Sequence, residues 1–257
     1  MTIHPPASDP TTQGTGLLDG YEPSGVDELV NAGGRVREHW VRIGQTLTDL
    51  GVEELRQRRR ESDRLLDEDG VTYNVVGAVN GEPSLTRRSR RWMLDPVPAV
   101  LPSDEWTLIE RAVIQRTELL NLVLADLYGP RDLIRTGIIP AELVYADPGF
   151  IRAWDQVRIA GPVQLVTSGF DIARASDGSH VVLADRAQAP SGFGYALENR
   201  VVASRVFPSM YRDSEVHRLA PFFRTLRSAL QAAAPPGADD PRIVVLTPGP
   251  HLSLIHI

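Results

Sequence analysis

The sequence contains no cysteine and no lysine. Without cysteine the chain can form neither disulfides nor thiolate zinc sites, and it has no cysteine nucleophile. Without lysine it lacks Schiff-base chemistry, a lysine general base and the lysine of a Walker-type phosphate loop. All 27 basic residues are therefore arginine. Any contact to a phosphate group must come from arginine, from backbone amides or from a metal ion.

Long hydrophobic runs are also missing. No stretch approaches the roughly 20 consecutive apolar residues that a membrane helix needs, and residues 1–20 lack the apolar segment of a signal peptide. We therefore expect no membrane partner and a cytoplasmic location. The net charge of −6 argues against nucleic acid as a partner, because proteins that bind nucleic acid present a basic face.

The order of patterns along the chain predicts an α+β fold with helices first and a hairpin-centred antiparallel sheet later. Residues 1–20 have few large apolar side chains, which predicts a disordered leader. Residues 21–235 form the main region and finish with a helix from Pro221 to Ala233. A strand from Arg242 to Leu246 is expected to start a further α/β subdomain over residues 240–250.

Two earlier segments have helical patterning. Val36 to Asp69 predicts two helices that separate at Gly51 and end at Gly70. Asp104 to Tyr128 predicts a long helix whose free amides Ser103 can cap. One buried stripe is expected on this helix from residues at helical spacing, namely Trp106, Ile109, Val113, Leu120, Leu124 and Leu127.

Two stretches are rich in arginine. Between Arg56 and Arg64 the arginines alternate with acidic residues, which favours a solvated, salt-bridged helix face over a binding patch. The run from Arg87 to Arg91 precedes Trp92, so a phosphate or RNA contact is conceivable. A loop leading into Trp92 is the favoured interpretation of this second run.

The most informative pattern is a β-hairpin. Leu165 to Arg174 and Ser179 to Asp185 read as strands, and Asp177-Gly178 between them is typical of a two-residue turn. Counting outward from that turn gives the register: Ser176 opposite Ser179, Ile172 opposite Leu183, and Asp171 opposite Ala184.

Alternation of side chains then divides the hairpin into two faces. The predicted polar face carries Asp171, Val182, Ala184 and Arg186, and the predicted core face carries Ile172, Val181 and Leu183. Asp171 and Arg186 are diagonal neighbours within reach of a long arginine side chain. On the residues alone, an ordinary strand ion pair worth less than about 1 kcal/mol is the favoured interpretation of that contact.

A loop of small residues follows the hairpin and leads into a helix that runs through Arg200. A helix start presents free amides, which suit a phosphate or a substrate carboxylate. Ser191 could cap this helix or contact a ligand. The spacing of Gly192 and Gly194 fits a phosphate loop and a plain capped turn equally well.

The segment from Asp185 to Arg200 closely resembles the signature of the circularly permuted ATP-grasp family, type 2, a group of bacterial proteins. The resemblance extends over most of the chain and includes Gly70–Asn74, Leu94–Pro98, Asp126–Gly129, Arg218–Phe223 and Leu246–Pro250. Members of the family continue past the last of these segments into a long nucleotide-binding portion. Residues 251–257 look non-native by comparison, so we expect a C-terminally truncated fragment that is inactive alone.

The resemblance implies a magnesium site on the hairpin. In ATP-grasp enzymes an Asp on one strand and a Glu-x-Asn on the next hold the Mg²⁺ ions of ATP. Asp171 matches the Asp, whereas Ala184 and Arg186 stand at the Glu and Asn positions. These two changes argue against ordinary Mg²⁺ binding. Losing even a residue that only positions a metal ligand typically lowers metal affinity or activity by about 10–100-fold. Our hypothesis is that Arg186 supplies a fixed positive charge in place of a metal.

The resemblance also implies an activity: an ATP-dependent ligase that makes an acyl phosphate on a small carboxylate substrate, which an amine or peptide then attacks. The candidate residues are Arg186 and Arg200 for catalysis, Asp171 for metal, and Asp185, Ser191, Gly192, Gly194, Glu198 and Asn199 for cofactor binding. The alternative is a non-catalytic relative that acts as a binding or scaffold protein for partner proteins of its operon. The replacements at Ala184 and Arg186 favour this alternative, and the intact polar loop favours the ligase.

Overall fold

The computed structural model describes residues 21–23, 26–31, 33–79, 82–157 and 161–245. The predicted leader over residues 1–20 and the predicted non-native tail over residues 251–257 lie outside the described residues. The elements follow in the order α1 (Glu38–Glu68), β1 (Thr72–Val79), β2 (Glu82–Arg91), α2 (Ser103–Leu127), α3 (Asp132–Arg135), α4 (Ala141–Tyr145), the 3-10 helix η1 (Arg152–Trp154), β3 (Gly169–Arg174), β4 (His180–Arg186), α5 (Phe193–Val206), α6 (Pro208–Asp213) and α7 (Ala220–Ala232). Helices and two antiparallel two-stranded sheets confirm the predicted α+β class.

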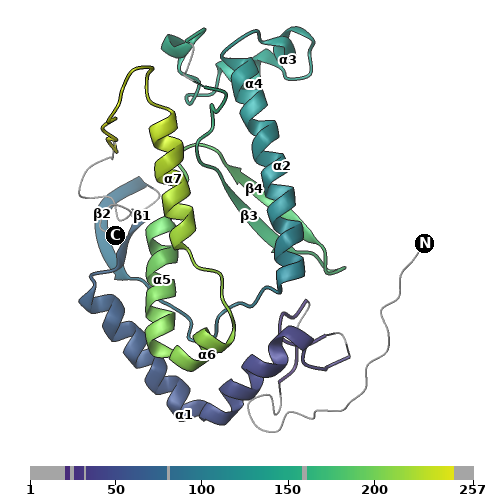
Figure 1. The fold of residues 1–257 in the computed structure, drawn as a ribbon, viewed down its shortest axis with the longest axis vertical. Helices are drawn as coiled ribbons and strands as arrows, with labels where there is room; N and C mark the ends of the chain where they lie inside the picture. The colour runs from purple at the N-terminus through teal and green to yellow at the C-terminus, as the bar shows by residue number, and fades with distance from the viewer. Residues whose placement is uncertain (1–20, 24–25, 32, 80–81, 158–160, 246–257) are drawn as a thin grey trace.

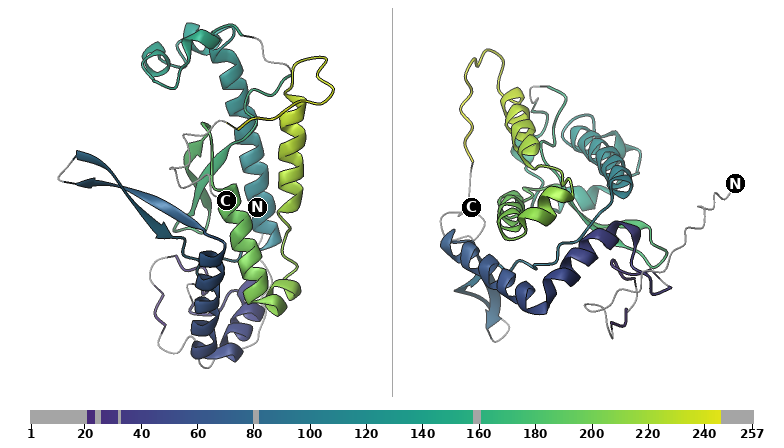
Figure 2. Two further views of the ribbon diagram at one scale, coloured as in Figure 1. Left: turned by 90° about the vertical axis from the view of Figure 1, so that its left-hand side faces the viewer. Right: turned by 60° about the horizontal axis from the view of Figure 1, so that its bottom comes forward.

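In the described part of the chain, none of the helices combines the length and apolar character needed to span a bilayer. Figure 1 shows the β3–β4 hairpin lying along α2, and α1 crossing the end of the molecule below α5. The β1–β2 hairpin extends away from this body (Figure 2).

Helix α1 is two helices joined at a kink, as the sequence predicts. Gly51 has φ 72° and ψ 169°, a conformation outside the helical region that costs glycine little. The second half ends at Gly70, where Gly70 N–H donates to Asp67 O and Val71 N–H donates to Leu66 O. These two bonds form a Schellman motif, which satisfies carbonyls that the helix end leaves free.

The main hydrophobic core lies where α1 meets α5. Leu66, Val202 and Val206 are among its most buried members. Tyr195 and Trp92 stack with ring centroids 4.3 Å apart beside this core. The first half of α1 itself contributes a smaller buried cluster of Trp40, Ile43 and Leu47.

Helix α2 begins one residue earlier than predicted, because Ser103 is its first residue and makes no capping bond, while Pro102 stands at the N-cap. The expected buried stripe is only partly formed. Among its members Ile109 alone is buried, Trp106 is exposed, and the others are half-buried. The helix covers one side of a narrow two-stranded hairpin, which is too small a surface to bury a full stripe.

The loop expected over Arg87–Arg91 is a strand. These residues belong to β2, which pairs antiparallel with β1 from Thr72 opposite Arg91 outward. The prediction failed because Arg87–Arg91 is polar at every position, so it shows none of the apolar–polar alternation that marks a strand in a sequence. Arg91 forms an ion pair with Asp67 at 2.6 Å.

The β3–β4 turn has three residues rather than the predicted two. Ala175 N–H donates to Ser179 O at 2.8 Å, Gly178 N–H donates to Ala175 O at 2.9 Å, and Gly178 has φ 84°. This is the usual three-residue arrangement, with a turn followed by a left-handed glycine. A bulge further along then places Ile172 opposite Val182 but Asp171 opposite Ala184. The predicted partner of Ile172 was wrong, and that of Asp171 was correct.

The bulge also changes which side chains are buried. Ile172, Val181 and Leu183 were expected to face the core, yet all three are exposed. Leu183 is the extra residue of the bulge and is 69% exposed. Val182 pairs with Ile172 and therefore shares its face, not the face of Asp171 as predicted. An inserted residue shifts the alternation by one, so a register counted without it assigns the wrong face.

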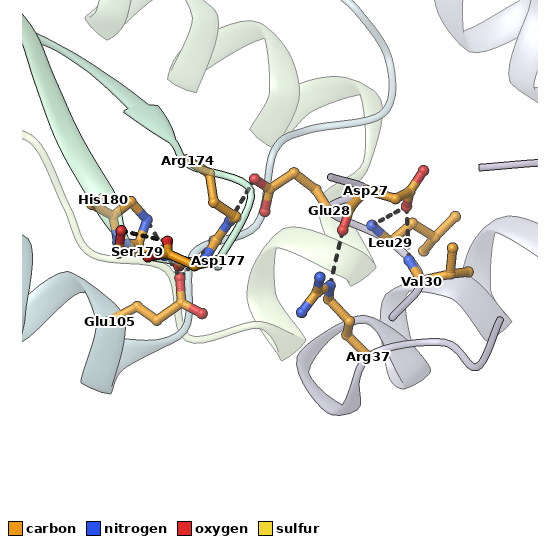
Figure 3. Close-up of polar contacts among 11 residues, drawn as sticks. Asp27, Glu28, Leu29, Val30, Arg37, Glu105, Arg174, Asp177, Ser179 and His180 are labelled. Atoms are coloured by element: carbon orange, nitrogen blue, oxygen red, sulfur yellow. Dashed lines mark hydrogen bonds and ion pairs between the residues drawn. The ribbon is translucent and has the colours of Figure 1, made fainter. Parts of the chain in front are cut away.

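Arg174 anchors the tip of the hairpin to two other parts of the chain (Figure 3). Its Nε donates to Glu28 at 2.7 Å and its Nη2 donates to Glu105 on α2 at 2.7 Å. Nη1 also donates to the carbonyl of Gly178 at 3.2 Å. The Arg174 side chain is only 9% exposed. Two carboxylates therefore hold a nearly buried guanidinium, which fixes the hairpin against α2 and the N-terminal segment.

At the C-terminal end, α7 matches the predicted helix within one residue at each boundary. The strand expected from Arg242 is not formed over the described residues 241–245, and Leu246 lies outside them. A strand needs a neighbour for its N–H and C=O groups. No described segment pairs with residues 241–245, and Val244 and Val245 are exposed.

Candidate functional site

The face of the β3–β4 hairpin that points away from α2 carries the predicted chemistry. Asp171 lies opposite Ala184, and Arg186 lies opposite Gly169, two pairs further from the turn and on the same face. Arg186 Nη2 donates to Asp171 Oδ2 at 2.6 Å. The side chains are 63% and 45% exposed. The predicted diagonal contact is therefore present, and it is open to solvent.

The ion pair has a defined electrostatic effect on the arginine. The hydrogen bond and the negative charge of Asp171 raise the pKa of Arg186 above its usual value, so this side chain is a permanent cation. Gly169 lies close beneath it, since a Cβ at Gly169 would be 3.5 Å from the Cβ atoms of both Arg186 and Pro190. The stem of Arg186 is thus packed against the start of the following loop.

Asp185 faces the other way. It receives two hydrogen bonds from Arg116 of α2, from Nε at 2.5 Å and from Nη2 at 2.7 Å. Hydrogen bonding to Arg116 holds the pKa of Asp185 below its usual range. The structure therefore separates Asp185 from Asp171 and engages it in holding the hairpin to α2. Sequence reasoning missed Arg116, because nothing near it in the sequence marks a partner 69 residues away.

The loop after β4 leads into α5 as predicted. Gly192 stands at the N-cap with φ 99°, and its carbonyl accepts the N–H of Ala196 at 3.0 Å. Ser191 is exposed and makes no capping bond to α5. Gly194 lies in the first turn. The first amide groups of α5 therefore have no side-chain cap, as the prediction of an open helix start requires.

The polar residues further along α5 are engaged in packing. Asn199 Oδ1 accepts a hydrogen bond from the indole Nε1 of Trp92 at 2.8 Å. Arg200 lies over the ring of Tyr211, 5.8 Å from its centroid. These contacts tie α5 to the segment after β2 and to α6. No contact joins them to the Asp171–Arg186 pair among the described residues.

Glu198 is the least satisfied residue of the signature. Its Oε1 atom is buried and has no hydrogen-bond partner among the described residues. Burial raises the pKa of the Glu198 carboxyl above its usual range, and the nearby Asp69 raises it further. Glu198 therefore favours its neutral form more than an exposed glutamate does.

The hairpin does not fit a magnesium site by itself. Mg²⁺ prefers several oxygen ligands in octahedral geometry. The hairpin offers the carboxylate of Asp171, which already accepts from Arg186, and opposite it stands only the methyl group of Ala184. Across the described residues no group of three or more His, Cys, Asp or Glu side chains lies where it could hold a metal ion. The positive charge beside Asp171 is the guanidinium of Arg186.

A comparison with protein families places residues 98–255 in the family described as circularly permuted ATP-grasp type 2. The matched range includes α2, the β3–β4 hairpin and α5. It thus contains the site described above.

Whole-chain relatives extend the similarity to the N-terminal helices. An uncharacterized protein of Mycobacterium tuberculosis is 38% identical over 230 residues, which cover 88% of this chain and 26% of the relative. A protein of Frankia alni that carries the provisional name glutamate–cysteine ligase 2-3 is 33% identical over 251 residues, or 97% of this chain and 28% of the relative. An uncharacterized protein of Mycobacterium leprae is 31% identical, with 91% of this chain and 41% of the relative covered. The chain therefore spans between about a quarter and two fifths of the length of these relatives.

Proposed function

The chain belongs to the circularly permuted ATP-grasp family, type 2, and on that premise we propose that the full-length protein is an ATP-dependent carboxylate–amine ligase. In this proposal ATP activates a small carboxylate and an amine or peptide attacks the activated acyl group. The name of the Frankia alni relative, a glutamate–cysteine ligase, supports a reaction of this class. The described residues would contribute one wall of the ATP site, and the rest of the site would lie outside them.

The observation that carries this proposal is the ion pair at the position where the family places its metal ligands. Arg186 Nη2 lies 2.6 Å from Asp171 Oδ2 on an exposed face of the hairpin. A guanidinium can donate to Asp171 with one edge and to a phosphate oxygen with its remaining N–H groups. Arg186 would thus neutralise charge on a phosphoryl group, a task that metal ions perform in other phosphoryl-transfer sites.

In this proposal Arg200 does not contact phosphate directly. Its guanidinium lies over Tyr211, so it would fix α5 relative to α6. The open start of α5 at Gly192 would offer amide groups to an anionic ligand. Ser191 is exposed beside it and could donate from its hydroxyl.

The decisive experiment exchanges the hairpin residues for those the family uses. ATP affinity of the full-length protein would be measured with and without Mg²⁺, for wild type and for the double variant Ala184→Glu, Arg186→Asn. We expect wild type to bind ATP with little dependence on Mg²⁺, and the double variant to require Mg²⁺. Equal dependence on Mg²⁺ in both proteins would contradict the proposed role of Arg186.

A non-catalytic binding or scaffold protein is the second candidate, and two observations favour it. Asn199 is held by Trp92, and the side chain opposite Asp171 is a methyl group, so few polar groups remain free at the site. ATP hydrolysis by the full-length protein in the presence of amino-acid and peptide substrates separates the two candidates. Hydrolysis that depends on such a substrate supports the ligase, and ATP binding without any turnover supports the scaffold.

A further inference from the structure

A cavity lies away from the polar face of the hairpin, where the chain leaves α2 and passes through α3, α4 and η1. Its volume is about 350 Å³, and Arg131, Tyr145, Phe150, Arg152 and Asp155 line it. Small-molecule sites commonly occupy roughly 300–1,000 Å³. None of these five residues has a role in the proposed function described above.

Aromatic rings form one wall of the cavity. Phe150 stacks on Tyr128 with ring centroids 5.0 Å apart, and Tyr145 meets Phe150 edge-on at 5.3 Å. Rings held in this way present a rigid apolar surface, because each is fixed by its neighbour.

Hydrogen bonds hold the two sides of the cavity together. Gln156 N–H donates to Tyr128 O at 3.0 Å, and the Gln156 side chain donates to Gly129 O at 2.5 Å. Ile151 N–H donates to the hydroxyl of Tyr128 at 2.9 Å. Arg131, before α3, also forms an ion pair with Asp155, after η1. The cavity is therefore a built feature of the fold rather than a gap between independent segments.

The backbone is strained at two residues of this region, one directly before α3 and one shortly after η1. Arg131 and Gln156 each have φ 59°, in the left-handed region that residues other than glycine adopt rarely. Strained backbone of this kind concentrates at binding and active sites, where the surrounding structure enforces it. Here the two strained residues flank a single cavity and are fixed by the contacts just described.

The charges in the cavity define the ligand it would accept. Asp155 and Arg131 neutralise each other, and Arg131 keeps the pKa of Asp155 below its usual range. The carbonyl of Arg152 accepts a hydrogen bond from Asp155 N–H at 3.2 Å, whereas its guanidinium makes no ion pair or hydrogen bond with another described residue. The cavity therefore has one uncommitted positive charge beside an aromatic wall. A nucleotide triphosphate would bring several negative charges close to Asp155, whereas a single carboxylate matches Arg152.

The cavity is also connected to the loop that follows the hairpin. Gly149 precedes the wall residue Phe150, and a Cβ at Gly149 would lie 3.6 Å from Oε1 of Gln188. Gln188 belongs to the loop between Arg186 and the start of α5. A ligand in the cavity would thus lie next to the segment that leads from the Asp171–Arg186 pair into α5.

We propose that this cavity binds the carboxylate of an amino acid or short peptide that has an aromatic or aliphatic side chain. Arg152 donates to the carboxylate, and Phe150 and Tyr145 pack against the side chain. That this ligand is a substrate of the ligase rests on the proposed function. The binding itself requires neither ATP nor the residues of the hairpin.

The test uses the full chain and two probes that differ in one group, N-acetyl-L-phenylalanine and its amide. Their affinities would be measured by calorimetry for wild type, Arg152→Gln and the control Arg135→Gln. Arg135 is an exposed arginine of α3 that pairs with Asp132 within its own helix. We expect wild type and the control to prefer the acid, and Arg152→Gln to lose roughly tenfold to a hundredfold of that affinity.

Several results would overturn the assignment. The first is that the acid does not bind to wild type, and the second is that wild type binds the acid and the amide with equal affinity. The third is that Arg152→Gln has a wild-type melting temperature and an unchanged affinity for the acid. Competition by ATP or inorganic phosphate for the same cavity would also overturn it, because the site would then be one for phosphate. Carboxylate binding in a protein that neither binds nor hydrolyses ATP would refute the proposed function and leave the cavity assignment intact.

Discussion

Arg186 lies directly opposite Gly169, yet its guanidinium donates diagonally to Asp171 at 2.6 Å. The missing side chain at Gly169 leaves room for the arginine stem, which packs close to this glycine. The positive charge is therefore held beside the carboxylate of Asp171, the residue that we propose corresponds to a metal ligand of the family.

Removing this charge should affect ligand binding far more than folding. Because the ion pair is exposed, Arg186→Gln should change the free energy of unfolding by less than about 1 kcal/mol. The same change should weaken ATP binding by roughly tenfold or more, as expected for loss of a charge-assisted hydrogen bond. Denaturant unfolding and nucleotide titration of Arg186→Gln and of Arg135→Gln measure both effects. Similar ATP affinities for the two variants would count against the role of Arg186.

The bond between Trp92 and Asn199 should contribute to stability. Asn199→Leu leaves the half-buried indole N–H without its partner, so we expect a loss of about 1–3 kcal/mol in the free energy of unfolding. Trp92→Phe should lower the free energy of unfolding less in the Asn199→Leu variant than in wild type, because the acceptor of the indole N–H is already absent there. A double-mutant cycle from urea unfolding measures this difference. Additive losses would show that the two side chains do not interact.

The bulge in β4 predicts contrasting effects for two leucines. Leu66 is fully buried in the core between α1 and α5, so Leu66→Ala should destabilise the protein by about 2–5 kcal/mol. Leu183 is 69% exposed, and Leu183→Ala should change stability by no more than about 0.5 kcal/mol. Thermal and denaturant unfolding of both variants provide the comparison. A large loss for Leu183→Ala would mean that Leu183 faces the core, as a hairpin without the bulge would require.

Glu198 predicts a dependence of stability on pH. Burial, with Asp69 nearby, raises the folded-state pKa of Glu198, while Arg205 opposes this shift. The folded state then holds the proton more tightly than the unfolded state does. The stability that this proton provides is complete below the unfolded pKa and is lost as the pH rises through the folded pKa.

Glu198→Gln should remove that loss, because glutamine stays neutral at every pH. We expect the variant to gain stability relative to wild type as the pH rises from about 4 to 8. Denaturant unfolding across this range, with Glu142→Gln on α4 as an exposed control, measures the difference. Parallel stability profiles for wild type and Glu198→Gln would contradict the raised pKa.

The structure also shows where sequence patterns succeed and where they fail. Gly51 and Gly70 marked the kink and the end of α1 correctly, because a glycine at such positions reflects local backbone geometry. The hairpin was correct in outline, and Asp171 was placed opposite Ala184. That agreement depended on two compensating features, a turn longer by one residue and a bulge at Leu183. A pattern of alternating residues contains no signal for either.

The amino-acid sequence by itself determined the α+β class, the family, and the absence of lysine and cysteine chemistry. Each of these follows from composition, local periodicity or a continuous motif. Only the tertiary structure decided that Asp185 pairs with Arg116, that Asn199 holds Trp92, and that Arg152 lines a cavity. The first two partners are 69 and 107 residues apart. Such contacts depend on how helices and strands pack, and packing is a property of the whole chain that no local pattern encodes.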